Sequence, residues 1–221
     1  MKRKNLNKLV LWAMGLLTDY SFKGVEYVPP RGPVLIATNH LSRIDIPLLG
    51  CLPTRPDITF LVTDKYQQYP FFRWFVLSAG GIWIDRTKAD FTAFRLAAGA
   101  LAEGRALGIA PEGTRSTTNE LLEGKPGTVL LSIQTKVPIV PVGIYGTETV
   151  VSEWKRLRKP HITANFGPPV TYPPLVRENR DVQLKQYTED LMCRIAALLP
   201  DKYHGFYAGN PHIAEIRAEQ V

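Results

Sequence analysis

Short apolar runs alternate with stretches of helical periodicity along most of this chain. Strands are predicted where apolar or β-branched residues cluster, at residues 33–38, 58–63, 81–85, 107–110, 138–144 and 161–166. Helices are predicted at residues 71–77, 91–103 and 128–136, and where Leu184, Tyr187, Leu191, Ile195 and Leu198 recur at helical spacing. This alternation predicts an α/β fold with a sheet flanked by helices.

The first twenty residues have a different pattern. An apolar run at residues 9–17 follows the cations Lys2, Arg3, Lys4 and Lys8. It is too short to span a bilayer, which takes about 20 apolar residues. A signal peptide would share this pattern, but no small-x-small cleavage site follows. We expect residues 1–20 to form an amphipathic helix in the membrane interface, and residues 21–221 to form the main domain. A helix packed on the core of that domain is the alternative.

The charge balance narrows the choice of partners. Lys and Arg number 27 against 20 Asp and Glu, which gives a net charge of +7. This favours an anionic partner such as nucleic acid, an anionic membrane surface or a phosphorylated substrate. Common nucleic-acid-binding motifs are absent, so nucleic acid is not expected. Cys51 and Cys193 form no disulfide framework, and neither Cys nor His residues have zinc-site spacing. We therefore expect a reducing compartment, no metal and no cofactor.

His40 and Asp45 are the first candidates for chemistry. They lie between the apolar run at 33–38 and a second run at 46–50 that is predicted to begin a helix. Turns that follow strands are where α/β folds place reactive groups, and a histidine oriented by a carboxylate is a general base near neutral pH. In the alternative, Ser42 or Asp45 only caps the helix. Because five residues turn about 140° on an ideal helix, pairing requires His40 in the turn and Asp45 at the helix start.

Three further segments concentrate charge, glycine or proline. They are Ile84-Asp85-Arg86, the run from Pro111 to Ser116, and the apolar segment 137–142. Separately, they are explained by a surface ion pair, an ordinary turn and a core strand. Together with the His40 turn, in this order, they resemble the four sequence blocks of the glycerolipid acyltransferase family, which includes the 1-acylglycerol-3-phosphate acyltransferases. The resemblance covers about residues 20 to 205.

The blocks match residue by residue, with two departures. Asn-His followed by four residues and Asp corresponds to Asn39, His40 and Asp45, with the family's frequent serine at Ser42. The second block ends in Ile-Asp-Arg, the third contains Pro-Glu-Gly-Thr-Arg-Ser, and the fourth is an apolar segment with proline. Ala110 and Trp83 stand where the family often has Phe, which should change the shape of a pocket more than its chemistry.

The resemblance implies a glycerol-3-phosphate acyltransferase-like mixed sheet and a reaction. A fatty acyl group would pass from acyl-CoA or acyl carrier protein to the free hydroxyl of 1-acyl-sn-glycerol 3-phosphate, giving phosphatidic acid. His40 would be the general base and Asp45 would orient it. The supporting residues would be Asn39, Ser42 and Asp85. The acceptor would bind at Arg86, Glu112, Gly113, Thr114 and Arg115, because arginine suits phosphate and the turn offers backbone N–H groups. Glu112 would hold a glycerol hydroxyl or an arginine.

Other functions remain open at this stage. A relative that acylates glycerol 3-phosphate or another lysophospholipid would share the four blocks. A peripheral membrane-binding protein without catalysis would not need the His40–Asp45 pair. A serine hydrolase is disfavoured because the chain lacks Gly-x-Ser-x-Gly. We expect a peripheral or monotopic enzyme at the cytoplasmic face of a membrane. If the N-terminal helix does not bind the membrane, the basic residues Lys155, Arg156, Arg158 and Lys159 would be the next candidates.

Overall fold

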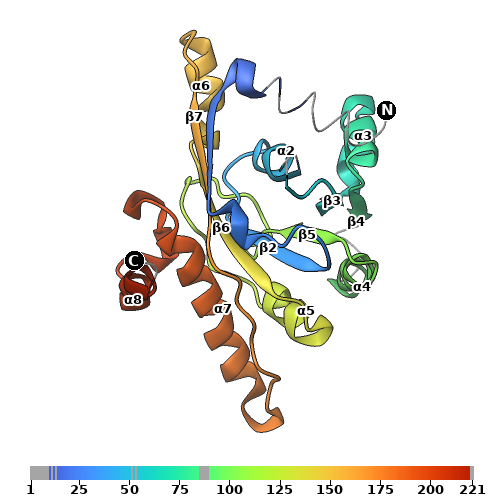
Figure 1. The fold of residues 1–221 in the computed structure, drawn as a ribbon, viewed down its shortest axis with the longest axis vertical. Helices are drawn as coiled ribbons and strands as arrows, with labels where there is room; N and C mark the ends of the chain where they lie inside the picture. The colour runs from blue at the N-terminus through green and yellow to red at the C-terminus, as the bar shows by residue number, and fades with distance from the viewer. Residues whose placement is uncertain are drawn as a thin grey trace.

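The computed structural model describes residues 14–50, 54–84 and 90–219, together with residues 10, 12 and 52. The side chains of residues 46, 47, 71 and 90 are not described. Within this part of the chain, seven strands form one sheet in the order β1-β7-β6-β2-β5-β3-β4 (Figure 1). β6, β2, β5, β3 and β4 are parallel to one another, β7 is antiparallel to β6, and β1 is parallel to β7. The mixed sheet flanked by helices confirms the predicted fold class.

The strands and helices follow the predicted alternation. The strands are β1 (Asp19–Lys23), β2 (Val34–Thr38), β3 (Thr59–Thr63), β4 (Ile82–Ile84), β5 (Ala106–Ile109), β6 (Ile139–Tyr145) and β7 (His161–Phe166). The helices are α2 (Asp45–Gly50), α3 (Pro70–Ser78), α4 (Asp90–Ala102), α5 (Gly127–Thr135), α6 (Val150–Lys155), α7 (Arg180–Ala197) and α8 (Pro211–Glu219). All six predicted strands and the four predicted helices are present, with ends that shift by a few residues.

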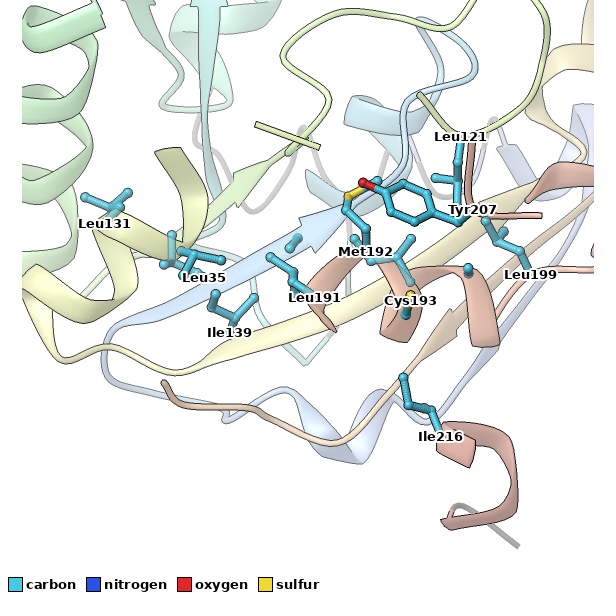
Figure 2. Close-up of a cluster of buried hydrophobic side chains, with 14 of the residues drawn as sticks. Leu35, Leu121, Leu131, Ile139, Leu191, Met192, Cys193, Leu199, Tyr207 and Ile216 are labelled. Atoms are coloured by element: carbon cyan, nitrogen blue, oxygen red, sulfur yellow. The ribbon is translucent and has the colours of Figure 1, made fainter. Parts of the chain in front are cut away.

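Both faces of the sheet are buried at its centre. Along β2, Leu35 and Ala37 belong to one apolar cluster, and Val34 and Ile36 belong to another, because successive side chains of a strand point to opposite faces. Figure 2 shows the first cluster, in which Leu35 and Ile139 of the sheet meet Leu191, Met192 and Cys193 of α7. A strand covered on both faces is apolar at every position. This explains why β2 was recognisable as an uninterrupted apolar run.

β1 is a strand that the apolar pattern does not predict. Its sequence, Asp-Tyr-Ser-Phe-Lys, has no fully buried residue, and pairing with β7 defines it, with Asp19 opposite His161. The expected domain boundary between residues 20 and 21 therefore falls inside a strand of the sheet. α6 and α8 were also not predicted, because α6 is short and α8 has only two buried apolar positions, Ile213 and Ile216.

The N-terminal segment is helical where it is described, at residues 10, 12 and 14–17. Met14 is buried in the second apolar cluster, whereas Trp12, Leu16 and Leu17 are exposed. The segment thus packs partly on the domain, as the alternative expectation held, and still presents apolar side chains at the surface. Its basic residues, Lys2 to Lys8, lie outside the described residues. Among the helices that are described, none is long and apolar enough to cross a membrane.

Candidate active site

The carboxyl ends of three neighbouring parallel strands bring distant blocks of the sequence together. β6, β2 and β5 are adjacent in the sheet, with β2 in the middle. His40 lies two residues after β2, Glu112 three residues after β5, and Thr147 two residues after β6. Turns at the carboxyl edge of parallel strands are the usual position of active sites in α/β folds. The first block, the third block and the segment that follows the fourth block therefore converge at one edge of the sheet.

His40 and Asp45 form a direct pair. The Nδ1 atom of His40 lies 2.9 Å from Oδ2 of Asp45. His40 lies in the turn, and Asp45 is the first residue of α2, which is the arrangement that their spacing required. With Nδ1–H donated to the carboxylate, Nε2 carries the ring's lone pair. The side chain of His40 is 22% exposed, whereas that of Asp45 is 1% exposed. The imidazole can therefore meet a substrate while its partner stays away from water.

The buried carboxylate of Asp45 is fully supplied with donors. Its Oδ2 atom also accepts the backbone N–H groups of Leu41 at 2.9 Å and Ser42 at 2.7 Å. Its Oδ1 atom accepts the hydroxyl of Thr147 at 2.6 Å. A buried charge is tolerated only when such hydrogen bonds replace its hydration. The two backbone N–H groups and the Thr147 hydroxyl hold the carboxylate in one orientation, and the carboxylate in turn orients the imidazole.

Gly146 determines where Thr147 lies. Its φ angle is +90°, and a Cβ atom at this position would be 2.1 Å from the carbonyl oxygen of His161. Only glycine fits such a position without displacing the backbone of β7. Thr147 is itself 1% exposed. The end of β6 thus delivers a hydroxyl group to Asp45, and the sequence analysis did not identify it, because the fourth block was taken to end at Val142.

Asn39 fastens the first block to β6. Its side-chain amide donates to the carbonyl of Ile144, and its Oδ1 atom accepts the N–H of Ile144, both at 2.8 Å. The side chain of Asn39 is completely buried. It therefore acts as one more backbone-like pair between β2 and β6, beyond the end of β2. Ser42 is also placed for support, because its Oγ atom accepts the N–H of Ile44 at 3.4 Å at the start of α2.

Glu112 is engaged with the backbone. Its Oε1 atom accepts the N–H of His40 at 2.8 Å, and its Oε2 atom accepts the N–H of Leu122 at 2.9 Å. The side chain is 1% exposed. Burial raises the pKa of Glu112 to about 7, against the lowering effect of the two N–H donors and of His40. The family resemblance implies that Glu112 holds a glycerol hydroxyl or an arginine. In the structure, the Glu112 carboxylate links the His40 turn to the third block. The N–H of Ser116, which donates to the His40 carbonyl, forms a second link between them.

The turn after Glu112 exposes a cationic surface. Gly113, Thr114 and Arg115 are all exposed. The N–H of Gly113 donates to the carbonyl of Ala110 at 3.0 Å, so it is already used and does not serve as the free phosphate donor that we expected. The side chain of Lys125 lies close to Gly113. A Cβ atom added to this glycine would be 3.2 Å from Nζ of Lys125. Lys125 is a second cation at this turn. It lies outside the matched sequence blocks, so the sequence did not identify it as a candidate.

The described part of the second block, Ile84, lies away from the His40 turn in the sheet. Asp85 and Arg86 fall outside the described residues, although Ile84 ends β4. In the sheet order, β4 is separated from β2 by β5 and β3. Three strand spacings place the ends of β2 and β4 about 14 Å apart. Closer to His40, Arg43 and Lys65 both lie over the ring of Tyr66, with 5.9 and 5.2 Å to its centroid.

Cys193 has no place in this site. It is buried in the apolar cluster between the sheet and α7. Burial, with a smaller effect of Glu189 and Asp190, raises the pKa of its thiol to about 12. A thiol with such a pKa is not a nucleophile at neutral pH. Cys193 therefore contributes to packing in the core, while Cys51 lies outside the described residues.

Comparison with known proteins gives one family. The family model for acyltransferases matches residues 19–145. A 1-acyl-sn-glycerol-3-phosphate acyltransferase of Saccharomyces cerevisiae is 38% identical over 139 residues, which are 61% of this chain and 45% of that protein. A lyso-ornithine lipid O-acyltransferase of Pseudomonas aeruginosa is 38% identical over 120 residues, which are 52% of this chain and 44% of that protein. The chain therefore spans about half the length of these relatives.

The fold has a relative among solved structures. The crystal structure of a 1-acyl-sn-glycerophosphate acyltransferase from Thermotoga maritima matches with a TM-score of 0.66 and 24% sequence identity. The match covers 86% of this chain and 76% of that one. At this identity the likeness concerns the fold, and it agrees with the mixed sheet described above.

Proposed function

The chain belongs to the acyltransferase family, and on this basis we propose that it transfers a fatty acyl group from an acyl thioester to the free hydroxyl of 1-acyl-sn-glycerol 3-phosphate. The product would be phosphatidic acid. The observation that carries the proposal is the His40–Asp45 pair, in which a partly exposed imidazole is one of four donors to a buried carboxylate. Acyl-CoA and acyl carrier protein both supply the thioester that this chemistry requires.

In the proposed mechanism, Nε2 of His40 removes the proton from the acceptor hydroxyl as its oxygen attacks the thioester carbonyl carbon. Asp45 accepts Nδ1–H throughout, which keeps the imidazole in the required tautomer and stabilises the imidazolium. The tetrahedral intermediate then collapses with cleavage of the carbon–sulfur bond. The imidazolium returns its proton to the leaving sulfur, so that an ester and a free thiol leave the enzyme. No acyl-enzyme forms, and both substrates must be bound together.

The acceptor phosphate is assigned to the exposed cations of the third block. Arg115 is the main candidate because its guanidinium can donate two hydrogen bonds to one phosphate. Lys125 and the N–H of Thr114 are the supporting groups, and Arg86 is a second candidate for the phosphate. Arg43 is our candidate for the phosphates of a coenzyme A donor, because it lies near the His40 turn with Lys65 beside it.

We place the reaction at the cytoplasmic face of an anionic membrane, with the N-terminal helix in the interface. Exposed Trp12, Leu16 and Leu17 support this placement, and so does the run of N-terminal cations. Replacing Lys2, Arg3, Lys4 and Lys8 with glutamine should lower the fraction of protein that sediments with anionic vesicles. An unchanged fraction would contradict this placement.

A thiol-release assay tests the reaction. Replacing His40 with alanine should lower kcat by several orders of magnitude, because removing a general base and its orienting pair removes two contributions at once. The matched control is His161→Ala. His161 also pairs through Nδ1 with an aspartate, Asp19, at 3.0 Å, but this pair is exposed on β7 and β1. A folded His40→Ala protein with a normal rate would refute the mechanism.

Kinetics with different acceptors test the identity of the substrate separately from the role of His40. Arg115→Gln should raise the KM for 1-acyl-sn-glycerol 3-phosphate with little change in kcat, since it removes uniform binding of the phosphate. A panel with glycerol 3-phosphate, other lysophospholipids and lyso-ornithine lipid tests the alternatives, the last because of the Pseudomonas relative. Faster turnover of another acceptor would replace the proposed substrate and leave the role of His40 intact. Thiol release without an acceptor would indicate a hydrolase.

A further inference from the structure

The end of α6 exposes an unusual combination of apolar and cationic side chains. Val151 is 61% exposed, Trp154 is 41% exposed and Leu157 is 97% exposed. Lys155, Arg156, Arg158 and Lys159 are exposed around them. These seven residues are referred to as the α6 patch. Single exposed apolar residues are ordinary on protein surfaces, but three within seven positions, among four cations, form a patch with a distinct character.

Leu157 is held outward by the backbone. Its φ angle is +58°, in the left-handed region that residues with a branched side chain seldom occupy. The N–H of Leu157 donates to the Trp154 carbonyl and the N–H of Arg158 to the Glu153 carbonyl, both at 3.0 Å. These bonds close the end of α6 and leave the leucine at its tip. A glycine or asparagine would adopt this turn at lower cost, so the backbone does not require leucine here.

The α6 patch is joined to the N-terminal helix. The indole Nε1 of Trp154 donates to the carbonyl of Leu17 at 2.8 Å, and Nζ of Lys159 donates to the carbonyl of Gly15 at 3.4 Å. Leu16 and Leu17 are themselves exposed. Two segments that lie far apart in the sequence therefore contribute to one apolar surface.

The α6 patch also lies at the catalytic edge of the sheet. α6 begins three residues after Thr147, whose hydroxyl is bonded to Asp45. In Figure 1, α6 lies at the top of the molecule, whereas α7 begins at the bottom. A surface that engaged the α6 patch would therefore be brought to the end of the molecule that carries His40.

The charge of the α6 patch identifies its partner. Between residues 150 and 160, four cations stand against one carboxylate, Glu153, which already pairs with Arg156 at 3.2 Å. Apolar tips surrounded by lysine and arginine match the boundary of an anionic bilayer, where phosphates lie above acyl chains. We propose that the α6 patch docks on an anionic membrane surface, with Leu157 and Trp154 entering the acyl boundary and the four cations meeting lipid phosphates. This contact is additional to the N-terminal helix and does not depend on the proposed reaction.

Vesicle binding by the full chain tests the proposal. Leu157→Asn removes the apolar tip and suits the left-handed turn, so the fold should be retained. Its partition onto phosphatidylglycerol-containing vesicles should fall by about tenfold, because a leucine is lost from the interface. Leu157→Trp should bind at least as well as the native protein, since tryptophan favours the interface. The matched control is Val182→Asn. Val182 is 59% exposed on α7, and its substitution should leave the partition unchanged.

The charges are tested separately. Arg158→Gln should weaken binding to anionic vesicles and leave binding to pure phosphatidylcholine vesicles unchanged. Native binding by Leu157→Asn would overturn the proposal, as would an equal loss in Val182→Asn. A native chain that does not bind anionic vesicles at all would also overturn it, and would leave the α6 patch to a protein partner. Circular dichroism of each variant confirms that a loss of binding is not a loss of fold.

Discussion

At the scale of single residues, the site depends on hydrogen bonds that orient a base. Asp45 receives the imidazole on one oxygen and the Thr147 hydroxyl on the other. Thr147 acts on His40 through Asp45, so we regard it as a positioning residue. Its bond crosses 102 residues of sequence. The orientation of the first block therefore depends on a residue beyond the fourth.

Thr147→Val tests this dependence. Valine preserves the shape of the side chain but leaves Oδ1 of Asp45 without a partner, at a cost of about 1–3 kcal/mol. We expect kcat to fall by at least about tenfold with little change in the KM of either substrate, because the lost interaction orients the base. Thr147→Ser keeps the hydroxyl and should restore kcat. Native kcat in the folded Thr147→Val protein would show that Asp45 is held without this bond.

At the scale of elements, the two edges of the sheet are specialised. The carboxyl edge carries the candidate active site. At the amino edge, the completely buried side chain of Arg55 links the segments that precede three of the strands. Arg55 donates to the carbonyls of Pro29, Gly32 and Gly104 and to the carboxylate of Asp57. These groups precede β2, β5 and β3. Burial acts to raise the pKa of Asp57, but the hydrogen bond and charge of Arg55 outweigh it, and the pKa lies below its ordinary value.

Replacing Arg55 should destabilise the sheet without touching the chemistry. Arg55→Met fills similar space but leaves three carbonyls and Asp57 without their donor. We expect the free energy of unfolding to fall by about 1.5–3 kcal/mol, because the carbonyls lose hydrogen bonds from a charged donor. Urea unfolding measures this value. The control is Arg105→Met, since the Arg105 pair with Glu103 is partly exposed and should cost about 1 kcal/mol or less. Equal losses of unfolding free energy in the two variants would show that Arg55 stabilises the sheet no more than a partly exposed ion pair does.

At the scale of the whole molecule, α8 docks on α7 through a charged cluster. Asp190 of α7 accepts bonds from Tyr172, Arg194 and His212, at 2.7 to 2.8 Å. The other ring nitrogen of His212 meets Glu215 at 2.9 Å. Hydrogen bonds to Asp190, and then to Glu215, raise the pKa of His212 above its ordinary value of 6.5. The charged imidazole therefore fastens the last helix to the domain.

This docking should depend on pH. Because the pKa of His212 is raised in the folded protein, its contribution is fully present below pH 6.5 and is lost as the pH rises through the raised value. Backbone amides of α8 should lose protection from hydrogen exchange across that range, after correction for intrinsic exchange rates. The His212 side chain bonds to Asp190 and Glu215 and not to the strands, so the sheet should keep its protection. His212→Gln should abolish the pH dependence, and an equally steep dependence in that variant would assign it elsewhere.

The sequence alone determined much of this protein, wherever the information is local. Buried strands are short apolar runs, so β2, β3, β5 and β6 were predictable. The five-residue spacing of His40 and Asp45 required a turn and a helix start, and the structure has both. The family blocks also came from the sequence, because each block is a short contiguous motif.

Only the tertiary structure decided which of these segments meet. The order β6-β2-β5 joins blocks that lie far apart, and it makes Glu112 a brace for the His40 turn across 72 residues. It likewise brings Thr147 to Asp45, and it separates Ile84 at the end of β4 from β2 by two strands. β1 is a strand because β7 pairs with it, not because of its own pattern. Such contacts depend on how the whole chain packs, and no local window of sequence contains that information.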